Sequence, residues 1–289
     1  MTTSVATWQW QTWQGLPYLT CSLLEPWSHG FFTQQFSPRS PAELVKVLDP
    51  AVPAYRIHQV HGNRVLSPSE VEQFQQEQMS SESGDGIEVI FPPADGLLTE
   101  QAGQAIWVCS ADCVPVLIAD VETGQTAAVH AGWRGTAGAI VPEAIARLRT
   151  QGSKLHNLRV AMGPAIAGEV YQVSTTVAAE VGATVVQDVV KTEPTPEPEV
   201  ILAALRELPE SPLLSDSQPG RARLDVRRVN GLQLEQAGIL TEHIAIAPYC
   251  TYQHAEHFFS YRRDRLKKVQ WSGIVSRDCS SPQPLSPSP

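Results

Sequence analysis

The hydrophobic positions along the chain fall into short apolar runs of strand type, separated by segments with helical spacing. Apolar and aromatic runs around residues 16–24 and 29–36 predict two strands. AIWVCSA, PVLIADV and TAAVHA, within residues 105–131, predict three more, and the polar ETGQ between the last two predicts a hairpin. LRVAMGP and HIAIAPYC are also typical of strands. YRIHQVHGNRVLSP predicts a strand that ends at the turn Gly62-Asn63.

Helical spacing occurs in four segments between these runs. PAELVKVLD begins with proline and repeats its apolar residues at helical period, which predicts a helix over residues 41–49. IVPEAIARLRTQG predicts a longer helix after the glycine-rich GWRGTAG, and a third is expected near residues 174–181. LDVRRVNGLQLEQAGI predicts a helix that ends at Gly238. Because helices and strands do not alternate strictly, the predicted fold class is α/β (α+β), with mixed β-sheets flanked by helices in layers.

Two polar stretches and the C-terminal tail stand apart from this pattern. Residues 68–92 are rich in serine, glutamate and glutamine, which predicts an exposed helix or a flexible loop. The acidic, proline-rich KTEPTPEPEV predicts a flexible loop within residues 190–220. The low-complexity residues 279–289 are expected to be disordered. We therefore expect a single catalytic domain over residues 1–278.

Composition narrows the classes of function. The chain has 289 residues and a net charge of −9, which argues against a general polyanion-binding surface, so no nucleic-acid partner is expected. No apolar run approaches the roughly 18 residues that a membrane span needs, so no membrane partner is expected. The five cysteines show no disulfide framework spacing, which favours reduced thiols and a cytoplasmic location.

Three side chains are the candidates for a catalytic metal site. Cys113 precedes one apolar strand, His130 ends the next, and His61 lies beside the turn at Gly62. Two imidazoles and one thiolate suit zinc, and three protein ligands leave the fourth position for water or substrate. His58 and His61, three apart on a strand, point to opposite faces and are not expected to bind one ligand together. His61 is preferred, because the glycine turn beside it leaves room for a ligand. A role as proton-transfer group is also assigned to His61.

Further residues are candidates for binding substrate or phosphate. Gly132-Trp133-Arg134-Gly135 precedes a helix, where free backbone N–H groups bind anions, and Arg134 adds a bidentate donor. A tight turn with a surface arginine is the alternative. The FFSYRRD segment contributes Tyr261 and Arg262, which suit stacking on a planar base at a pocket rim. Asn63 and Gly135 complete this set. Cys250, His254 and His257 form a second, less favoured metal cluster.

The motifs occur in the order seen in a known family. HQVHGN, ADGLLT, CSADCVPVLIAD, AAVHAGWRG, the GP…YQV segment and FFSYRRD resemble the laccase-domain, multicopper polyphenol oxidoreductase-like family from about His29 to Asp264. The resemblance implies one α/β domain of cysteine-hydrolase-like laccase-domain fold, with a metal at His61, Cys113 and His130. It also implies phosphorolysis of adenosine, inosine, guanosine and methylthioadenosine, with adenosine deamination as a further activity. Some members are called peptidoglycan-editing factors.

The expected cofactor is zinc, with copper as the alternative. Laccase chemistry with a three-copper cluster needs paired H-x-H motifs, and this chain has none. A second reading makes Cys113 a nucleophile activated by His130, in a hydrolase or amidase that edits peptidoglycan. A third is a metal-dependent binding protein without turnover. The expected partners are a purine nucleoside and phosphate, and the chain is expected to be a monomer or a small homo-oligomer.

Overall fold

Two six-stranded sheets make up the centre of the computed structural model, which describes residues 6–81, 90–192 and 196–279. Across the first sheet the strands are β1 (Trp8–Trp13), β2 (Leu16–Cys21), β3 (His29–Phe32), β15 (Gln270–Val275), β7 (Ala105–Ser110) and β4 (Ala54–Tyr55). Across the second they are β14 (Ile244–Ile246), β10 (Leu158–Met162), β8 (Val114–Asp120), β9 (Thr126–Ala131), β6 (Gly96–Leu98) and β5 (Val65–Leu66). Both sheets mix parallel and antiparallel pairs.

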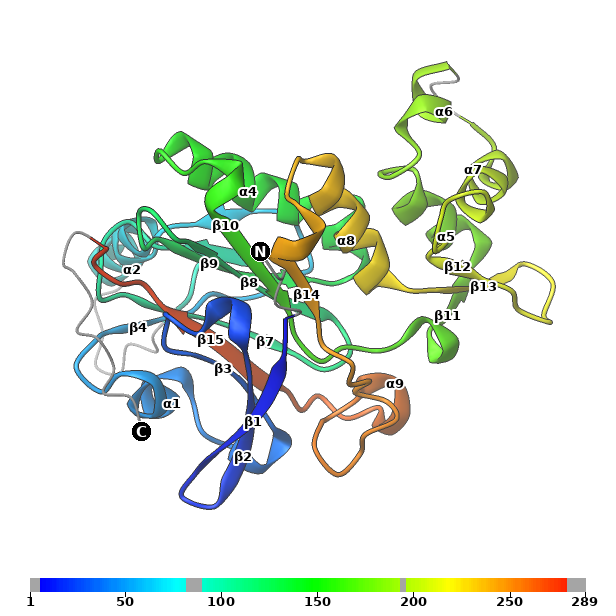
Figure 1. The fold of residues 1–289 in the computed structure, drawn as a ribbon. Coiled ribbons are helices and arrows are strands. Elements are labelled where there is room, and N and C mark those ends of the chain that lie inside the picture. Colours follow the sequence, from blue (N-terminus) through cyan, green and yellow to red (C-terminus); the bar gives the residue numbers. More distant parts are fainter. Residues whose placement is uncertain (1–5, 82–89, 193–195, 280–289) are drawn as a thin grey trace.

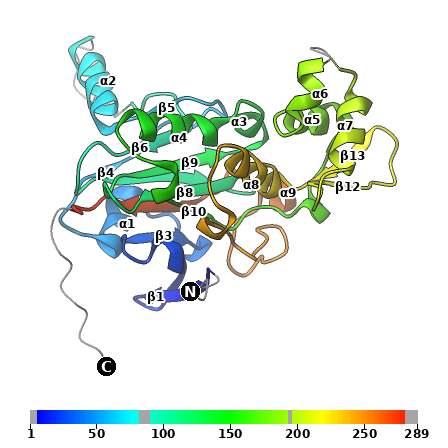
Figure 2. The ribbon, with the colours of Figure 1, turned by 45° about the horizontal axis from the view of Figure 1, so that its top comes forward.

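The sheets lie face to face, and helices cover their outer faces (Figures 1 and 2). Between the sheets, Phe31 and Ile106 from the first pack with Leu97 and Leu117 from the second in one buried cluster. Helices α4 (Ile140–Thr150) and α8 (Val226–Gln236) cover the second sheet, and α1 (Pro41–Leu48) covers the first. β8 and β9 are buried along their whole length, which explains why they appear in the sequence as continuous apolar runs.

A peripheral unit lies at one end of the second sheet, at the right of Figure 1. It contains a three-stranded sheet and three helices: β11 (Gln172–Ser174), β13 (Arg221–Leu224), β12 (Leu213–Leu214), α5 (Thr175–Gly182), α6 (Gln187–Thr192) and α7 (Pro198–Arg206). The remaining helices are η1 (Ser22–Leu24), η2 (Gln34–Phe36), α2 (Pro68–Ser81), α3 (Trp133–Ala137), η3 (Leu155–Asn157), η4 (Gly168–Val170), η5 (Thr241–His243) and α9 (Tyr261–Asp264).

The structure confirms the predicted fold class of mixed sheets flanked by helices. The predicted hairpin is the antiparallel pair β8–β9, in which Val116 lies opposite Val129. The predicted helix that ends at Gly238 is α8, and Gly238 has the positive φ of 95° that such an end favours. No helix in the described part of the chain is long and apolar enough to cross a membrane.

Two predictions about local structure are wrong. The segment Tyr55–Val60 is not a strand, because β4 ends at Tyr55 and the backbone N–H groups that follow Gln59 bond to a side chain instead of a neighbouring strand. The predicted loop over residues 190–220 contains α7, whose buried Ile201, Leu202 and Leu205 pack into the core, and it also contains β12. In the polar stretch 68–92, the helix α2 forms. Further along that stretch, residues 82–89 lie outside the described residues. Most of the predicted disordered tail, residues 280–289, also lies outside them.

Candidate metal centre

The three candidate ligands come together at one end of the second sheet. β8 and β9 are antiparallel, with Val114 opposite Ala131, so Cys113 at the start of β8 lies beside the end of β9. His130 is the penultimate residue of β9, and its side chain is buried with 3% exposed. His61 comes from the connection between β4 and β5 and is exposed. The site is therefore built on two rigid central strands and completed by one surface loop.

One ligand atom from each of His61, Cys113 and His130 lies within 4.8 Å of the other two. The ring centroids of His61 and His130 are 4.9 Å apart, and the rings are nearly perpendicular at 80°. Cys113 is half-buried between the buried His130 and the exposed His61. The arrangement therefore opens to solvent on the side of His61.

Asp95, which is not among the predicted site residues, holds two of these residues. Its carboxylate accepts hydrogen bonds from His130 Nδ1 at 2.8 Å and from the backbone N–H groups of His61 and Gly62, at 2.9 and 2.6 Å. Asp95 is fully buried. Burial raises the pKa of its carboxyl, but the hydrogen bonds from His130 and the two amides outweigh burial and lower the pKa below the ordinary value. The Ala94-Asp95-Gly96 turn before a buried strand was the available signal.

The thiol and the buried imidazole shift each other's protonation. Burial raises the pKa of Cys113, but the charge of His130 and hydrogen bonds from both histidines lower it to about 6. Burial lowers the pKa of His130, but the charge of Cys113 and the bond to Asp95 raise it to about 9. Both shifts favour the thiolate of Cys113, which is the form that binds a metal.

Gly132 keeps the space between the three side chains free. A Cβ atom at this position would lie 2.9 Å from Cys113 Sγ, 3.3 Å from His61 Cδ2 and 3.7 Å from His130 Cε1. Such a Cβ would therefore contact all three candidate ligand side chains. The donor set of two imidazoles and a thiolate suits zinc or copper, so the residues present fit a metal ion.

Asp112 joins the Cys113 loop to the FFSYRRD segment. Its carboxylate accepts hydrogen bonds from Thr251 Oγ1 and from the backbone N–H of Arg262, both at 2.7 Å. Asp112 has a φ of 93°, a strained conformation for a residue with a side chain. Arg262, predicted to bind substrate, is therefore tied to the residue that precedes Cys113.

The guanidinium of Arg262 lies over an aromatic ring that the sequence analysis did not single out. Its Cζ is 4.7 Å from the ring centroid of Tyr171, and its Nη1 donates to the Gln172 carbonyl at 2.9 Å. Burial, followed by the charge of Cys113, raises the pKa of Tyr171 to about 12. Tyr261 is 48% exposed, beside Arg262 on α9. The FFSYRRD segment therefore supplies a cation in a fixed position, Arg262, and an exposed ring, Tyr261, next to the loop that carries Cys113.

The other predicted substrate residues lie around α3. The GWRGTAG segment forms this short helix itself, with Gly132 as its N-cap, whereas the long α4 begins only at Ile140. The prediction of a glycine-rich turn directly in front of one long helix is therefore wrong, because the segment is itself helical. Arg134 is exposed, with its Cζ 4.3 Å from the centre of the Trp133 ring. Gly135 is buried, and a Cβ there would lie 2.9 Å from the carbonyl oxygen of Gly62.

Asn63 has a structural partner at the end of α3. Its side-chain amide donates to the Gly138 carbonyl at 2.9 Å, which ties the His61 loop to the junction between α3 and α4. Asn63 is itself exposed. The loop that carries His61 is thus attached to the helix that starts beside Cys113.

The second cluster of the sequence analysis is not brought together as a ligand set. The described residues hold only one group of three or more potential ligands at metal-binding distance, namely His61, Cys113 and His130. Cys250 is buried, and its Sγ accepts a hydrogen bond from the backbone N–H of Ala167. Cys109 is a half-buried residue of β7, and burial raises the pKa of its thiol to about 12.

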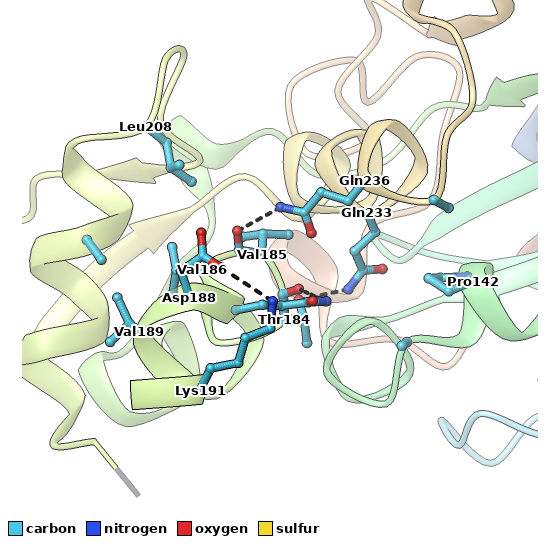
Figure 3. A pocket seen from close by; sticks show the side chains of 14 residues that line it. Pro142, Thr184, Val185, Val186, Asp188, Val189, Lys191, Leu208, Gln233 and Gln236 are labelled. Carbon is cyan, nitrogen blue, oxygen red and sulfur yellow. Dashed lines mark hydrogen bonds and ion pairs between the residues drawn. The ribbon is translucent and has the colours of Figure 1, made fainter. Parts of the chain in front are cut away.

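A cavity of about 810 Å³ lies away from this centre, between α8 and the peripheral unit (Figure 3). Its 14 lining residues include Val185, Leu208, Gln233 and Gln236, and none of them is a predicted site residue. The chemistry-bearing side chains are therefore at the strand ends and not in this cavity.

Comparisons with known proteins show relatives over most of the chain. The family model described as multi-copper polyphenol oxidoreductase laccase matches residues 42–275. A protein of Synechocystis sp. named purine nucleoside phosphorylase is 48% identical over 93% of this chain and 97% of its own length. A protein from an unknown prokaryote named adenosine deaminase is 30% identical over 62% of this chain and 60% of its own.

Solved structures include the same architecture. The crystal structure of YlmD from Geobacillus stearothermophilus superposes with a TM-score of 0.69 and 25% identity, covering 93% of this chain and 99% of that one. The family model spans most of this chain, and the relative from Synechocystis covers nearly all of it. The chain therefore belongs to the multi-copper polyphenol oxidoreductase laccase family.

Proposed function

We propose that this protein is a metal-dependent purine nucleoside phosphorylase that acts on adenosine, inosine, guanosine and methylthioadenosine. The observation that carries the proposal is the convergence of His61, Cys113 and His130 within 4.8 Å, with Gly132 leaving the space between them free. Relatives named purine nucleoside phosphorylase support the choice of reaction. We further propose one cytoplasmic catalytic domain over residues 1–278, as a monomer or a small homo-oligomer.

His61, Cys113 and His130 are the residues that would hold the metal, with zinc favoured and copper as the alternative. When bound, the ion would supply Lewis-acid polarisation of a substrate oxygen or nitrogen. Three protein donors would leave the ion accessible to substrate, and the exposed His61 marks the side from which substrate would enter. Its position at the mouth also makes His61 the candidate for moving a proton between substrate and solvent.

The neighbouring residues would bind the two substrates. Arg134 and the backbone of Gly135 on α3 are assigned to phosphate, with Asn63 holding the adjoining loop. Arg262 and Tyr261 are assigned to the nucleoside, where the exposed ring offers a stacking face for the purine. A phosphate oxygen would attack C1′ of the ribose, the bond from C1′ to the base nitrogen would break, and the base would leave with a proton.

Adenosine deamination is proposed as a further activity of the same site, because one relative is named adenosine deaminase. Here water would replace the amino group at C6 of adenine, and ammonia would be released. The alternative reading as a Cys/His hydrolase or amidase rests on the thiolate–imidazolium pair of Cys113 and His130. That alternative requires activity in the metal-free protein and inhibition by thiol alkylation.

Metal analysis and base release from adenosine and inosine test the proposal together. We expect bound metal in the purified protein and base release that requires phosphate, whereas release without phosphate would indicate hydrolysis. Cys113→Ala and His130→Ala should lose both metal and turnover. Cys109→Ala is the matched control, because this cysteine lies four residues away on β7 with a raised pKa and should keep both. A metal-free Cys113→Ala protein with full activity would refute the scheme.

A further inference from the structure

We infer that Asp95 is a positioning residue that sets both imidazole ligands in place before a metal binds. The inference rests on the metal centre proposed above and deepens it, because Asp95 does not itself belong to the ligand set. It lies immediately before the buried strand β6 (Gly96–Leu98) and so is anchored to the second sheet.

The first contact fixes the ring of His130. Asp95 Oδ1 lies 2.8 Å from His130 Nδ1, and the backbone carbonyl of Asp95 accepts the N–H of His130, also at 2.8 Å. With Nδ1 committed to this hydrogen bond, Nε2 is the nitrogen left to bind a metal. A carboxylate on the far nitrogen of a ligating histidine fixes the ring and makes the ligating nitrogen a stronger donor.

The second set of contacts fixes the loop of His61. The backbone N–H groups of Val60, His61 and Gly62 all donate to the same carboxylate, at 3.2, 2.9 and 2.6 Å. His61 has a φ of 60°, in the left-handed region, which costs a residue with a side chain about 1 kcal/mol. Hydrogen bonds to a charged carboxylate are stronger than neutral ones and hold this strained turn.

The backbone of Asp95 closes the arrangement. Its N–H donates to the Arg64 carbonyl at 2.9 Å, on the other side of the His61 turn. The fully buried Asp95 therefore contacts His130 through both its side chain and its backbone. It also bonds to the backbone before and after His61. Because neither set of contacts includes the ion, the ring of His130 and the backbone that carries His61 are placed by the fold itself.

The test is the affinity of the protein for Co²⁺, measured by absorption titration against a competing chelator. Asp95→Asn keeps the size of the side chain but turns one acceptor oxygen into an NH₂ group, which cannot accept from the donors around it. We expect the affinity of Asp95→Asn for Co²⁺ to fall by about 10- to 100-fold. We also expect a changed thiolate-to-cobalt charge-transfer band, which a loss of fold stability alone would not produce.

Asp120→Asn is the matched control. Asp120 is also a fully buried aspartate that accepts backbone N–H groups, from Glu122 and Thr123, but it lies at the opposite end of β8. Its replacement should lower the free energy of unfolding and leave the Co²⁺ affinity unchanged. Unchanged affinity and spectrum in Asp95→Asn would overturn the inference, as would an equal loss of affinity in both variants.

A measurement on the unmodified protein covers the case in which Asp95→Asn does not fold. In the Zn²⁺-loaded protein, long-range ¹H–¹⁵N spectra should show the proton of His130 on Nδ1. A proton on Nε2 would overturn the inference. Failure of the wild-type protein to bind Co²⁺ or Zn²⁺ would instead refute the proposed metal centre, so the two failures are distinguishable.

Discussion

Gly132 is the residue at which the smallest change should have the largest effect on the metal centre. A single added carbon would lie 2.9 Å from Cys113 Sγ, closer than van der Waals contact allows. We expect Gly132→Ala to lower the affinity for Zn²⁺ at least about tenfold, the equivalent of 1.4 kcal/mol. Its φ of −71° suits alanine, so the backbone should not change. Isothermal titration with Zn²⁺ measures the effect.

Gly231→Ala controls for the added methyl group. Gly231 lies within α8, and a Cβ there would meet other atoms only at 3.8 Å. Alanine is also the better helix former by about 1 kcal/mol. This variant should therefore gain stability and keep its Zn²⁺ affinity, and equal losses in the two glycine variants would contradict the role assigned to Gly132.

His29 should make the stability of the fold depend on pH. Burial lowers the pKa of His29 to about 4 from the ordinary 6.5, against a smaller opposite effect of its bond to the Trp27 carbonyl. Between pH 6.5 and pH 4 His29 is therefore mostly protonated in the unfolded chain and mostly neutral in the folded protein. Above pH 6.5 His29 should therefore not reduce the free energy of unfolding. At pH 4 the free energy of unfolding should be lower by about 3 kcal/mol because of this residue.

Urea unfolding between pH 4 and 7 measures this dependence. In His29→Gln the part of the pH slope due to this residue should disappear, even if the variant is less stable at every pH. Full retention of the slope in His29→Gln would show that other groups cause it.

At the scale of residues, the sequence predicted the donors but not the residue that orients them. Cys113 and His130 stand at the ends of continuous apolar runs, and this local pattern placed them at the rim of a sheet. Asp95 acts through hydrogen bonds to residues about 35 positions away on either side. No local pattern records such contacts, because they exist only once the strands have paired.

At the scale of elements, α3 depends on α8 for its position. Gln233 of α8 donates through Nε2 to the Thr136 carbonyl at 2.8 Å, and Asn230 donates to the Thr136 hydroxyl at 3.1 Å. Thr136 is fully buried near the end of α3, two residues after Arg134. The short helix is therefore held at the end opposite to the one that faces Cys113.

Replacing Gln233 should affect stability and phosphate binding together. Gln233→Ala removes the side-chain donor to the Thr136 carbonyl, which still accepts the backbone N–H of Ala139 at 3.0 Å, so the loss should cost about 1 kcal/mol of unfolding free energy. If Arg134 binds phosphate as proposed, the KM for phosphate should also rise several-fold with a smaller change in kcat. Steady-state kinetics at varied phosphate and chemical denaturation measure the two effects.

Gln236→Ala is the comparison for this prediction. Gln236 lies on the same helix and donates to the Val185 carbonyl at 2.8 Å, without contact to Thr136 (Figure 3). It should lose stability and keep the KM for phosphate. A KM that moves in neither variant would show that α3 does not depend on this anchor for binding.

The elements that the sequence predicted well are those with many buried positions. β8 and β9 are buried along their whole length and appear as continuous apolar runs, whereas α4 buries Ile140, Val141, Ala144, Ile145 and Leu148 at helical spacing. The segment from Tyr55 was assigned to a strand because its composition suits one. Its backbone instead turns to reach Asp95, and that side chain overrides the strand propensity.

At the scale of the molecule, the two sheets approach closely where β10 ends. A Cβ at Gly163 would lie 2.1 Å from the ring of Phe31, which belongs to β3 of the other sheet. Gly163→Ala should therefore lower the free energy of unfolding by about 2 kcal/mol through overpacking. Chemical denaturation measures the loss.

Phe31→Leu combined with Gly163→Ala tests the cause of that loss. The smaller side chain should make room for the added methyl group, so the two costs should not add and part of the stability should return. Strictly additive costs would place the strain somewhere other than at Phe31.

The layered fold could be predicted because its class follows from the order of strands and helices, whereas the peripheral unit could not. In the three-stranded sheet of that unit β11 pairs with β13, which lies far from it in the chain, and α7 begins within a proline-rich run that resembles a loop. Pairing of this kind depends on which surfaces meet after the core has formed.

The pairing of Gln172 with Arg223 places the first and last strands of the peripheral unit side by side. Because the chain enters and leaves this unit through adjacent paired strands, a change of length within the unit need not alter the path of the chain through the two large sheets. Insertions and deletions between these two positions should therefore be better tolerated than changes of equal size anywhere along β8 and β9.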